Sequence, residues 1–424
     1  MEKLIDNVGF AKITGKNITY FLQNLRQIVL EVTDKCNLNC TYCAYSDLYR
    51  GYDSREGKYL PFQKAKLIID YLFNIWKENC TEGVNREFTY SFYGGEPLMN
   101  IELIKQVVNY VKELENVGRV YSFSMTTNAM LLDKYMDYLV DKNFRLLISL
   151  DGDEFAQSYR VDHAGKNSFE RVFSNLKGLQ EKYPEYFKNK IGFNSVLHNR
   201  NEVEFICRFI KSQFDKTPRI AALNNIGICE EKRDEFTRMF RNPIESILHS
   251  KNCEEIESEL LMKAPRVARL ADYILHQSGN SFFSYNDLYI NKKKHDFPPT
   301  GTCLPFSKKM FVSVNGKILP CERIGQQFSL GQVYDDRVEL DEEYIANQHN
   351  YYLSKYTKQC ASCASNRFCM QCVYQIDDIC NNNTRCLSYL TAKELEERNR
   401  NTFRFLQEHP YYYRRILEEV KYVV

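Results

Sequence analysis

The stretch Cys36-Asn37-Leu38-Asn39-Cys40-Thr41-Tyr42-Cys43 follows shortly after the apolar run Ile28-Val29-Leu30-Glu31-Val32, and the chain is organised around it. Three cysteines on one short loop can ligate three irons of a [4Fe–4S] cube and leave the fourth iron open. An open metal position is typical of a catalytic site, because a substrate or cofactor can complete the coordination. A three-cysteine zinc site is the alternative. Zinc motifs usually pair a CxxC with a second CxxC or with histidines, and no histidine lies near this loop in the sequence.

Composition limits the class of protein. The 424 residues can bury a large core in one to three domains, and the formal net charge of +2 gives no electrostatic argument for nucleic acid or an acidic membrane. The opening MEKLIDNVGFAKITGK is too polar for a signal peptide, and no apolar run approaches about 18 residues. These features predict a cytoplasmic protein without a membrane partner. Fifteen cysteines in a reducing compartment then favour metal binding over disulfides.

Strand-like and helix-like segments alternate from about residue 27 to residue 230. Such repeated βα units predict a parallel sheet with helices outside it, either doubly wound or a full or partial barrel. The predicted strands are Gln27–Val32, Phe88–Tyr93, Tyr121–Met125, Arg145–Leu150, Ile191–Val196 and Arg219–Leu223, and the predicted helices are 62–79, 101–116, 132–142, 168–182 and 200–213.

The remaining segments have a different character. Ile18–Phe21 alternates weakly and predicts a short strand, whereas residues 233–249 and 254–278 predict two helices. After Pro298-Pro299-Thr300-Gly301 the chain becomes loop-rich, and its clear regular element is a hairpin of Met310–Val314 and Lys317–Leu319 around Asn315-Gly316. Residues 391–424 predict one C-terminal helix.

Polar motifs stand at successive ends of the predicted strands. Tyr93-Gly94-Gly95-Glu96-Pro97 combines glycines, which let backbone approach a ligand, with a carboxylate suited to an ammonium group. Ser124–Asn128 offers hydroxyls and an amide, and Ser149-Leu150-Asp151-Gly152 offers a carboxylate for ribose hydroxyls, with Arg160 beyond it. A plain turn or a helix N-cap explains each motif taken alone. Their shared position at one edge of a parallel sheet is what favours a site.

Together, CxxxCxxC, GGEP and SLDG resemble the radical S-adenosylmethionine (SAM) superfamily. The cysteine-rich tail resembles its SPASM subgroup, whose members mature peptides and proteins. The resemblance covers residues 27–223 and 301–390 and implies an α/β fold: a partial (β/α)6 barrel followed by a loop-rich SPASM domain that binds auxiliary iron–sulfur clusters. The expected organisation is an N-terminal segment (1–26), the barrel (27–230), a helical insert (231–300), the SPASM domain (301–390) and a C-terminal helix (391–424).

The resemblance implies a role for each matching residue. Cys36, Cys40 and Cys43 would ligate the radical-generating [4Fe–4S] cluster, whose open iron chelates SAM. The other implied SAM contacts are Gly94, Gly95 and Glu96 to the ammonium, Ser124 and Arg160 to the carboxylate, Ser149 and Asp151 to the ribose, and Asn194. Tyr42 would pack on the purine, although core packing explains this tyrosine equally well.

Eight of the fifteen cysteines lie between Cys303 and Cys386. By analogy, the SPASM pattern assigns three of them to auxiliary cluster I and four to auxiliary cluster II, with one gap of two residues where the pattern normally has three. A pair of structural zinc sites is the alternative. The assignment is Cys303, Cys321 and Cys372 for cluster I and Cys360, Cys363, Cys369 and Cys386 for cluster II, with Cys380 either completing cluster I or replacing Cys386.

Two positions distinguish this tail from that of sulfatase maturases. Those enzymes carry a cysteine six residues after the first of the tail, where this chain has Lys309, so an open iron in auxiliary cluster I becomes an expectation. They also place an aspartate proposed as a base directly after the next cysteine, where this chain has Glu322. Glu322 is therefore a candidate catalytic base, and an exposed acid beside a cluster loop is the alternative.

The expected function is that of a radical SAM maturase. It would use a 5′-deoxyadenosyl radical to modify a ribosomally synthesised peptide oxidatively, with a thioether, C–C or C–O cross-link as product. The alternatives are an anaerobic sulfatase-maturating enzyme that forms formylglycine and a non-catalytic iron–sulfur electron carrier. SAM and three [4Fe–4S] clusters are the expected cofactors. The expected partners are a peptide or protein substrate and a flavodoxin- or ferredoxin-like reductant. Since the N-terminal segment is too short for a leader-binding domain, either a separate leader-binding protein or the helices of residues 231–300 would have to bind the leader.

Overall fold

The computed structural model describes residues 12–79, 86–115, 117–274, 300–366, 369–376, 379 and 385–420. The chain forms two compact units. The first described below consists of Ile13–Arg241 and Cys303–His349, and the second of Met1–Lys12, Asn242–Thr302 and Asn350–Val424. The sequence-based domain boundaries at residues 26, 230, 300 and 390 remain predictions.

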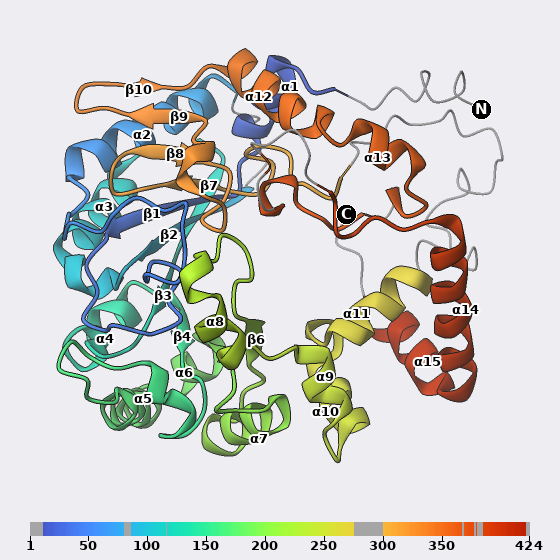
Figure 1. Cartoon of the computed structure of the whole chain (residues 1–424). Coiled ribbons are helices and arrows are strands. Elements are labelled where there is room, and N and C mark those ends of the chain that lie inside the picture. The colour runs from blue at the N-terminus through green and yellow to red at the C-terminus, as the bar shows by residue number, and fades with distance from the viewer. Residues whose placement is uncertain are drawn as a thin grey trace. The chain divides into compact units, whose positions relative to one another are not determined.

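One ten-stranded sheet organises the first unit (Figure 1), in the order β10-β9-β8-β7-β1-β2-β3-β4-β5-β6. Strands β1 to β6 are parallel and lie in chain order. All six strands predicted from the sequence are therefore present. Their bounds are β1 Gln27–Thr33, β2 Arg86–Gly94, β3 Arg119–Thr127, β4 Arg145–Ser149, β5 Ile191–Leu197 and β6 Arg219–Ala222.

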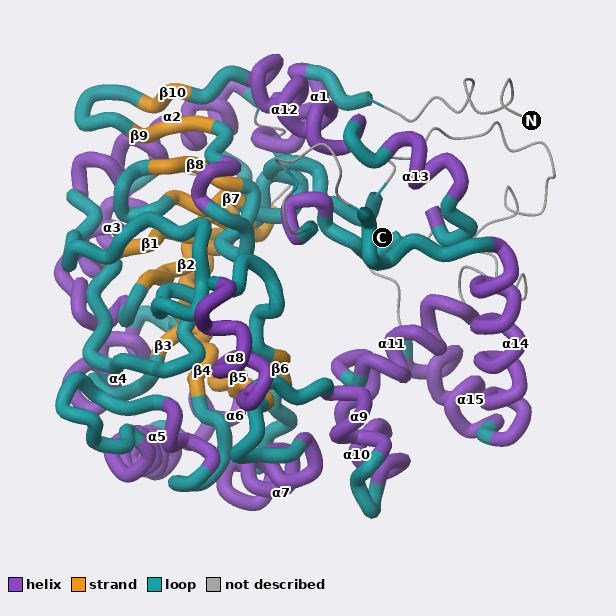
Figure 2. Tube along the Cα trace, viewed as in Figure 1, coloured by secondary structure: helices purple, strands orange, loops and turns teal. Residues whose placement is uncertain are grey.

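Helices connect these strands and lie along one outer side of the sheet (Figure 2). Each buries an apolar stripe against it, as Trp76 does against Phe88 with ring centroids 4.5 Å apart. This side of the sheet carries the core, which leaves the opposite side and the strand ends for polar residues. The helices are α2 Phe62–Glu78, α3 Ile101–Glu113, α4 Leu132–Asp141, α5 Phe169–Lys182, α6 Pro184–Lys190 and α7 Val203–Phe214. A further helix, α8 (Arg233–Met239), follows β6 and packs in a hydrophobic cluster with Tyr42 and Leu48.

The predicted hairpin is confirmed, and it extends the main sheet. β7 (Met310–Val312) and β8 (Lys317–Leu319) pair antiparallel, and β7 also pairs parallel with β1. Gly316 allows the turn, because its φ is +84° and a Cβ would lie 2.3 Å from the Val333 carbonyl oxygen. Two further strands, β9 (Gly331–Val333) and β10 (Val338–Glu339), continue this antiparallel edge.

Several sequence-based element predictions were wrong. Ile18 belongs to a helix, α1 (Gly15–Gln23), because Ile18 and Leu22 stand four residues apart and are both buried. Three predicted long helices are each divided at a proline, which removes an internal hydrogen-bond donor and starts a new helix well. Pro243 starts α9 (Pro243–Leu248), Pro265 separates α10 (Cys253–Leu260) from α11 (Pro265–Asp272), and Pro410 separates α14 (Ala392–Glu408) from α15 (Pro410–Glu419).

The second unit is helical around a buried ion pair. Glu257 on α10 is 1% exposed, and it accepts hydrogen bonds from Arg266 of α11 and from the Tyr412 hydroxyl of α15. The unit also contains α13 (Thr357–Ser362), and α12 (Glu342–Ser354) leads into it. Among the described residues of the whole chain, no helix has the length and apolarity needed to cross a membrane.

Candidate active site

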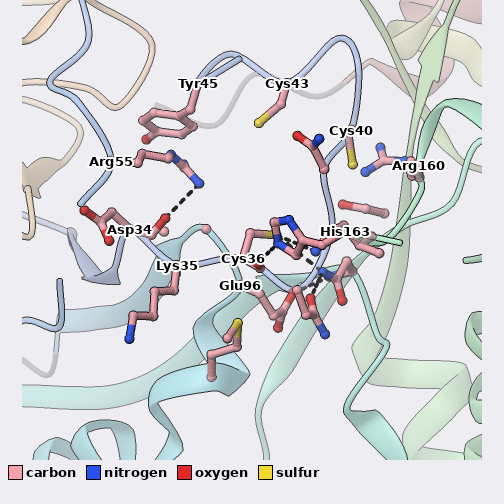
Figure 3. Close-up of a pocket in the computed structure, with 18 of the residues that line it drawn as sticks. Asp34, Lys35, Cys36, Cys40, Cys43, Tyr45, Arg55, Glu96, Arg160 and His163 are labelled. Atoms are coloured by element: carbon pink, nitrogen blue, oxygen red, sulfur yellow. Dashed lines mark hydrogen bonds between the residues drawn. The ribbon is translucent and has the colours of Figure 1, made fainter. Parts of the chain in front are cut away.

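The cysteine loop directly follows β1 and is fixed by backbone hydrogen bonds. The amide of Asn39 donates to the Val161 carbonyl at 2.7 Å, and that of Thr41 donates to the Tyr159 carbonyl at 3.2 Å. These bonds hold the loop against the segment that follows β4. The thiols of Cys36, Cys40 and Cys43 line a cavity of about 860 Å³ together with Glu96, Arg160 and other residues of the strand ends (Figure 3). This volume lies within the range of about 300–1,000 Å³ typical of small-molecule sites.

The three thiols influence one another electrostatically. Burial raises the pKa of Cys36 to about 11, and Glu96 and Cys43 add to the shift. Burial likewise raises the pKa of Cys40 to about 12, although Arg160 opposes the shift. Soft, desolvated thiols at neutral pH need a metal to become thiolates, because coordination removes the proton.

The arrangement of these thiols fits an iron–sulfur cube. Among the described residues, no three His, Cys, Asp or Glu side chains converge closely enough to chelate one metal ion. The cysteines of a [4Fe–4S] cube each bind a different iron and therefore stand apart. Three neighbouring thiols around a cavity meet that requirement better than the requirement of a single zinc ion.

Gly94 and Gly95 follow β2 and pack directly on the stem of the cysteine loop. Gly94 has a φ of +138°, and a Cβ there would lie 2.1 Å from the Thr33 carbonyl oxygen. At Gly95 the Cβ would lie 2.0 Å from the Lys35 carbonyl oxygen. Both residues line the cavity, and their contact with the SAM ammonium stays a prediction. Both positions must lack a side chain because the backbone of residues 33–35 packs against them. From the sequence alone, only close approach to a ligand was predicted as the reason for the glycines.

Glu96 is a buried carboxylate without a cationic partner in the described structure. Its side chain is 1% exposed and accepts hydrogen bonds from Thr127 Oγ1 at 2.7 Å, the Asn128 amide at 2.7 Å and the Leu98 amide at 3.1 Å. Burial raises its pKa to about 7, although the three hydrogen bonds lower it. A carboxylate held in this way is suited to a ligand ammonium, which would supply the missing positive charge.

Tyr42, Asp151 and Arg160 form a hydrogen-bonded group beside Cys40. Arg160 Nε and Nη2 donate to the two Asp151 carboxylate oxygens at 2.9 and 3.1 Å, and the Tyr42 hydroxyl donates to the same carboxylate. Although burial alone raises the pKa of Asp151, Arg160 and His198 hold it at about 2. In the structure, the Asp151 carboxylate therefore accepts hydrogen bonds from protein groups. Its contact with the ribose stays a prediction. Only Arg160 of the three lines the cavity.

The remaining predicted SAM contacts divide into two groups. Ser149, at the end of β4, lines the cavity. Ser124 lies three residues before the end of β3, its hydroxyl is 2.6 Å from that of Ser91, and Thr126 lines the cavity in its place. Asn194 pairs with Ser149 in the sheet and is not among the cavity-lining residues.

The sequence analysis missed several residues that line this cavity. Asn128 donates to Asn37 Oδ1 at 2.7 Å, and the His163 ring nitrogen lies 2.8 Å from the Cys36 carbonyl oxygen. Asn128 ends the motif Ser124–Asn128, and His163 lies three residues after Arg160, so these neighbours were the available signal. Tyr45 and Arg55 belong to no motif and carried no signal.

Two cysteines assigned to auxiliary cluster I belong to the first unit. Cys321 is half-buried and Cys303 is exposed, while Cys372 belongs to the second unit. Burial raises the pKa of Cys321 to about 11, with Glu322 adding to the shift. Lys309 Nζ lies 2.7 Å from the Glu322 carboxylate, so the residue at the missing cysteine position pairs with the candidate base.

The second unit brings four tail cysteines near one another. Burial raises the pKa of Cys360 to about 12, and the charges of Cys369, Cys386 and Cys363 add to the shift. Cys386 is tied to this group by its amide, which donates to Gln359 Oε1 at 3.1 Å. These are the four cysteines that the resemblance assigns to auxiliary cluster II. Cys380 lies outside the described residues.

Comparison with known proteins adds a family and a fold. Residues 30–210 match the family model of the radical SAM superfamily. A cysteine-type anaerobic sulfatase-maturating enzyme of Clostridium novyi is 28% identical over 45% of this chain and 49% of its own length. A radical SAM cyclopropyl synthase of Paramaledivibacter caminithermalis is 30% identical over 41% of this chain and 36% of its own length. The chain thus spans about half or less of these two relatives.

A longer alignment relates the chain to one enzyme class. The cysteine-type anaerobic sulfatase-maturating enzyme of Clostridium perfringens (strain ATCC 13124) is 22% identical over 81% of this chain and 87% of its own length. The solved structure of native anSMEcpe with bound AdoMet covers 93% of this chain and 100% of its own, with a TM-score of 0.58 and 17% identity. The structural likeness supports the predicted fold class, a radical SAM partial barrel with a cysteine-rich C-terminal region.

Proposed function

We propose that the chain is an enzyme of the radical SAM superfamily, whose family model residues 30–210 match, and that it oxidatively modifies a peptide or protein. Membership implies SAM and a [4Fe–4S] cluster as cofactors. The relation to anaerobic sulfatase-maturating enzymes points to peptide or protein substrates rather than small metabolites. For anSMEcpe, a solved structure contains both AdoMet and the Kp18Cys peptide.

One observation carries this proposal. Three half-buried thiols and a buried carboxylate without a counter-ion face the same cavity, which is what a cluster with an ammonium-bearing ligand requires. An electron carrier needs the thiols alone. A buried, charged Glu96 carboxylate lowers the stability of the free protein, and a bound ammonium group would offset this destabilisation.

The chain's own residues would perform distinct tasks. Cys36, Cys40 and Cys43 would hold the cluster, and Glu96 would bind the SAM ammonium. Arg160, oriented by its two bonds to Asp151, would contribute positive charge at the cavity wall. When bound, the cluster and SAM together supply one-electron chemistry that abstracts a hydrogen atom from the substrate. The cavity walls would exclude water from that step.

For the product, we propose a cross-link within a ribosomally synthesised peptide. Lys309 occupies the position of a cysteine in sulfatase maturases, so the assigned cysteines would leave auxiliary cluster I short of one protein ligand, a place that a substrate thiolate would fit. The tail cysteines named above would hold two auxiliary clusters, which supply one-electron chemistry when bound. Glu322, held by Lys309 beside Cys321, is our candidate to accept the proton.

Formylglycine formation in a sulfatase is the second candidate. It is favoured by the alignment with the Clostridium perfringens enzyme over 81% of this chain. Both candidates need SAM, a protein substrate and a one-electron donor of the flavodoxin or ferredoxin type. They differ in the product. A cross-link joins two groups of one peptide with loss of two hydrogen atoms, whereas formylglycine is an aldehyde at a single residue and its formation from cysteine also removes the sulfur.

Anaerobic reconstitution tests the proposed function. We expect roughly twelve irons per chain if three cubes form. We also expect 5′-deoxyadenosine to be released from SAM after reduction with dithionite, measured by chromatography. Zinc without iron, or iron without SAM cleavage, would contradict the proposal. Mass spectrometry of a precursor peptide or sulfatase encoded beside this protein then separates the two products.

A further inference from the structure

Arg55 lies on the loop between β1 and α2 and lines the same cavity as the cysteine loop. Its guanidinium carbon lies 3.6 Å from the centroid of the Tyr45 ring, and its Nη1 donates to the Asp34 carbonyl oxygen at 2.9 Å. Figure 3 shows this stacked arrangement beside the Cys43 thiol. The guanidinium plane is therefore fixed by the protein and does not sample many orientations.

The other edge of this guanidinium has no hydrogen-bond acceptor among the described residues. Arg55 Nε and Nη2 are buried from solvent, and no described atom accepts from either. Asp34 Oδ1 is likewise buried without a donor, although Asp34 Oδ2 accepts from the Glu56 amide at 3.0 Å. Buried polar atoms left unsatisfied in this way call for an explanation, of which an absent ligand is one.

Acidic side chains on the surrounding loops already have partners. Asp53 is paired with Lys317 at 2.7 Å, and Glu322 is paired with Lys309 at 2.7 Å. Glu31 accepts from the Val314 amide at 2.9 Å. The buried Glu31 carboxylate also interacts electrostatically with Arg55, which lowers the pKa of Glu31 against the effect of burial. In the described structure no carboxylate is within ion-pair distance of Arg55, so its Nε and Nη2 remain available to hydrogen-bond a ligand.

The chain itself shows what an Nε and Nη2 edge can hold. Arg160 presents the same two nitrogens to Asp151, at 2.9 and 3.1 Å from its two carboxylate oxygens. This side-on, bidentate pairing is the geometry in which arginine recognises a carboxylate. Arg55 presents the equivalent edge, with no carboxylate opposite it.

The position of Arg55 indicates which molecule supplies that carboxylate. In Figure 3, Arg55 and Asp34 lie on one side of the cavity, and Arg160 and His163 lie on the other. Arg160, a proposed SAM contact, therefore lies across the cavity from Arg55 and leaves the Arg55 side to another ligand. Asp34 Oδ1 adds a hydrogen-bond acceptor there, which suits an N–H group close to the carboxylate.

We propose that Arg55, with Asp34, binds a carboxylate and a neighbouring N–H group of the peptide substrate. This inference rests on the proposed function, because it names a feature of the substrate for the same cavity. Arg55 is then a specificity-determining residue, and the preferred substrate carries a glutamate, an aspartate or a free C-terminus close to the modified residue. SAM also contains a carboxylate, so the experiment must separate the two sources.

Calorimetric titration of the SAM-loaded, reconstituted holoenzyme without reductant tests this proposal. The probes are acetyl-glycyl-glutamyl-glycinamide and its glutamine counterpart. We expect the glutamyl probe to bind about tenfold more tightly, as one charge-assisted bidentate contact implies. Arg55→Gln should remove this preference, Arg55→Lys should retain part of it, and neither change should alter the affinity for SAM.

Arg171→Gln is the matched control, because Arg171 is half-exposed on α5 and pairs with Asp133 outside the cavity. It should retain the full preference. Equal binding of both probes by the unaltered protein, or no binding of either, would overturn the inference. A loss of SAM affinity in Arg55→Gln with an unchanged probe preference would assign Arg55 to SAM instead. SAM cleavage by the same preparation reports separately on the proposed function.

Discussion

The two described groups of cysteines are positioned by different means. Cys36, Cys40 and Cys43 follow a buried strand, and the backbone of neighbouring strand ends holds their loop. Cys360, Cys363, Cys369 and Cys386 lie on one short helix and the turns around it, and local hydrogen bonds hold them near one another. The first group thus depends on a sheet built from distant segments, whereas the second depends mainly on its own immediate neighbours.

Because of this difference, substitutions in the two cysteine groups should have different effects. In a parallel sheet, the strand ends converge on one edge, so a change in one motif reaches the other motifs. In a loop-rich segment, a bound cluster supplies much of the folding free energy itself. We therefore expect changes at the first group to affect the cavity, and changes at the second to affect mainly its own metal content.

The largest contrast is expected from single cysteine substitutions. Cys43→Ala should reduce SAM cleavage to background and remove about four irons, because one lost thiolate exposes the cube. Cys360→Ala should also remove about four irons, but should leave SAM cleavage in the absence of peptide within about twofold. Iron analysis and 5′-deoxyadenosine release measure the two effects.

Cys229→Ala is the control, since Cys229 is half-buried and is assigned to neither group. It should retain both iron and cleavage. Equal loss of SAM cleavage in Cys43→Ala and Cys360→Ala would show that the two regions are not independent.

Each region contains a glycine that packs directly against backbone, and replacing this glycine should have the next largest effect, on the free energy of unfolding. A Cβ at Gly95 would lie 2.0 Å from the Lys35 carbonyl oxygen, and a Cβ at Gly301 would lie 2.1 Å from the Cys369 carbonyl oxygen. Each Gly→Ala change should lower the free energy of unfolding by about 3 kcal/mol, because backbone must move. Denaturant titration under anaerobic conditions measures this.

Gly178→Ala provides the matched comparison. Gly178 lies inside α5, and a Cβ there would meet nothing within 4 Å. The alanine should raise the free energy of unfolding by about 0.5–1 kcal/mol through helix propensity. In addition, Gly95→Ala should weaken SAM binding, whereas Gly301→Ala should not. Measuring SAM affinity in both variants therefore also compares the two regions.

Glu96 gives a smaller, pH-dependent effect that is confined to the first region. Its pKa of about 7 lies above the usual glutamate value of 4.5, so the folded protein binds this proton more tightly than the unfolded chain does. The free protein should therefore gain stability from this group as pH falls from about 7 towards 4.5. SAM binding should weaken over the same interval, because the ammonium prefers the carboxylate.

Glu96→Gln should weaken SAM binding about tenfold to a hundredfold at pH 8 and remove the pH dependence. Glu87→Gln, at an exposed position of β2 that pairs with Arg145, should leave both unchanged. Equilibrium dialysis with radiolabelled SAM between pH 6 and pH 8.5 measures the effect. An unchanged pH profile in Glu96→Gln would assign the titration to another group.

The smallest predicted effect concerns the Tyr42 hydroxyl. Tyr42→Phe removes one donor from the buried Asp151 carboxylate and should lower the free energy of unfolding by about 1–2 kcal/mol. Tyr49→Phe is the control, because the Tyr49 hydroxyl is buried without a partner among the described residues. Its removal should be neutral or slightly stabilising. The two melting temperatures, compared in one buffer, test the assignment.

The sequence predicted the parallel sheet because buried strands and amphipathic helices have distinct periods. Strands β1 to β5 appeared as short apolar or aromatic runs, β6 had a weaker pattern, and the motifs after β1, β2, β3 and β4 fell at one edge. The helices of residues 233–278 and 391–424 were predicted as too long, since the apolar period continues across Pro243, Pro265 and Pro410. The pairing of β7 with β1 could not be predicted, because short apolar runs do not specify a partner.

The sequence predicted which residues line the candidate site better than it predicted the hydrogen bonds that they make. Glu96 and the glycines stood at strand ends, so their place in the cavity followed from topology. Ser124 lies on the same face of β3 as the cavity-lining Thr126 but farther from the end of the strand. The period of two in a strand predicts which face a residue occupies, but not how far along the strand the cavity reaches. The capture of Asp151 by Arg160, and the orientation of Arg55, depend on loop conformation that no spacing encodes.

The pairing of β1 with β7 has a consequence for the order in which the protein is made. The amide of Val314 reaches the Glu31 carboxylate across 283 residues, so one edge of β1 stays open until most of the chain has left the ribosome. An open edge beside β1 invites pairing with other chains during that interval. We therefore expect nascent chains truncated before residue 310 to need a chaperone to remain dispersed, even though every cysteine of the first group is already present.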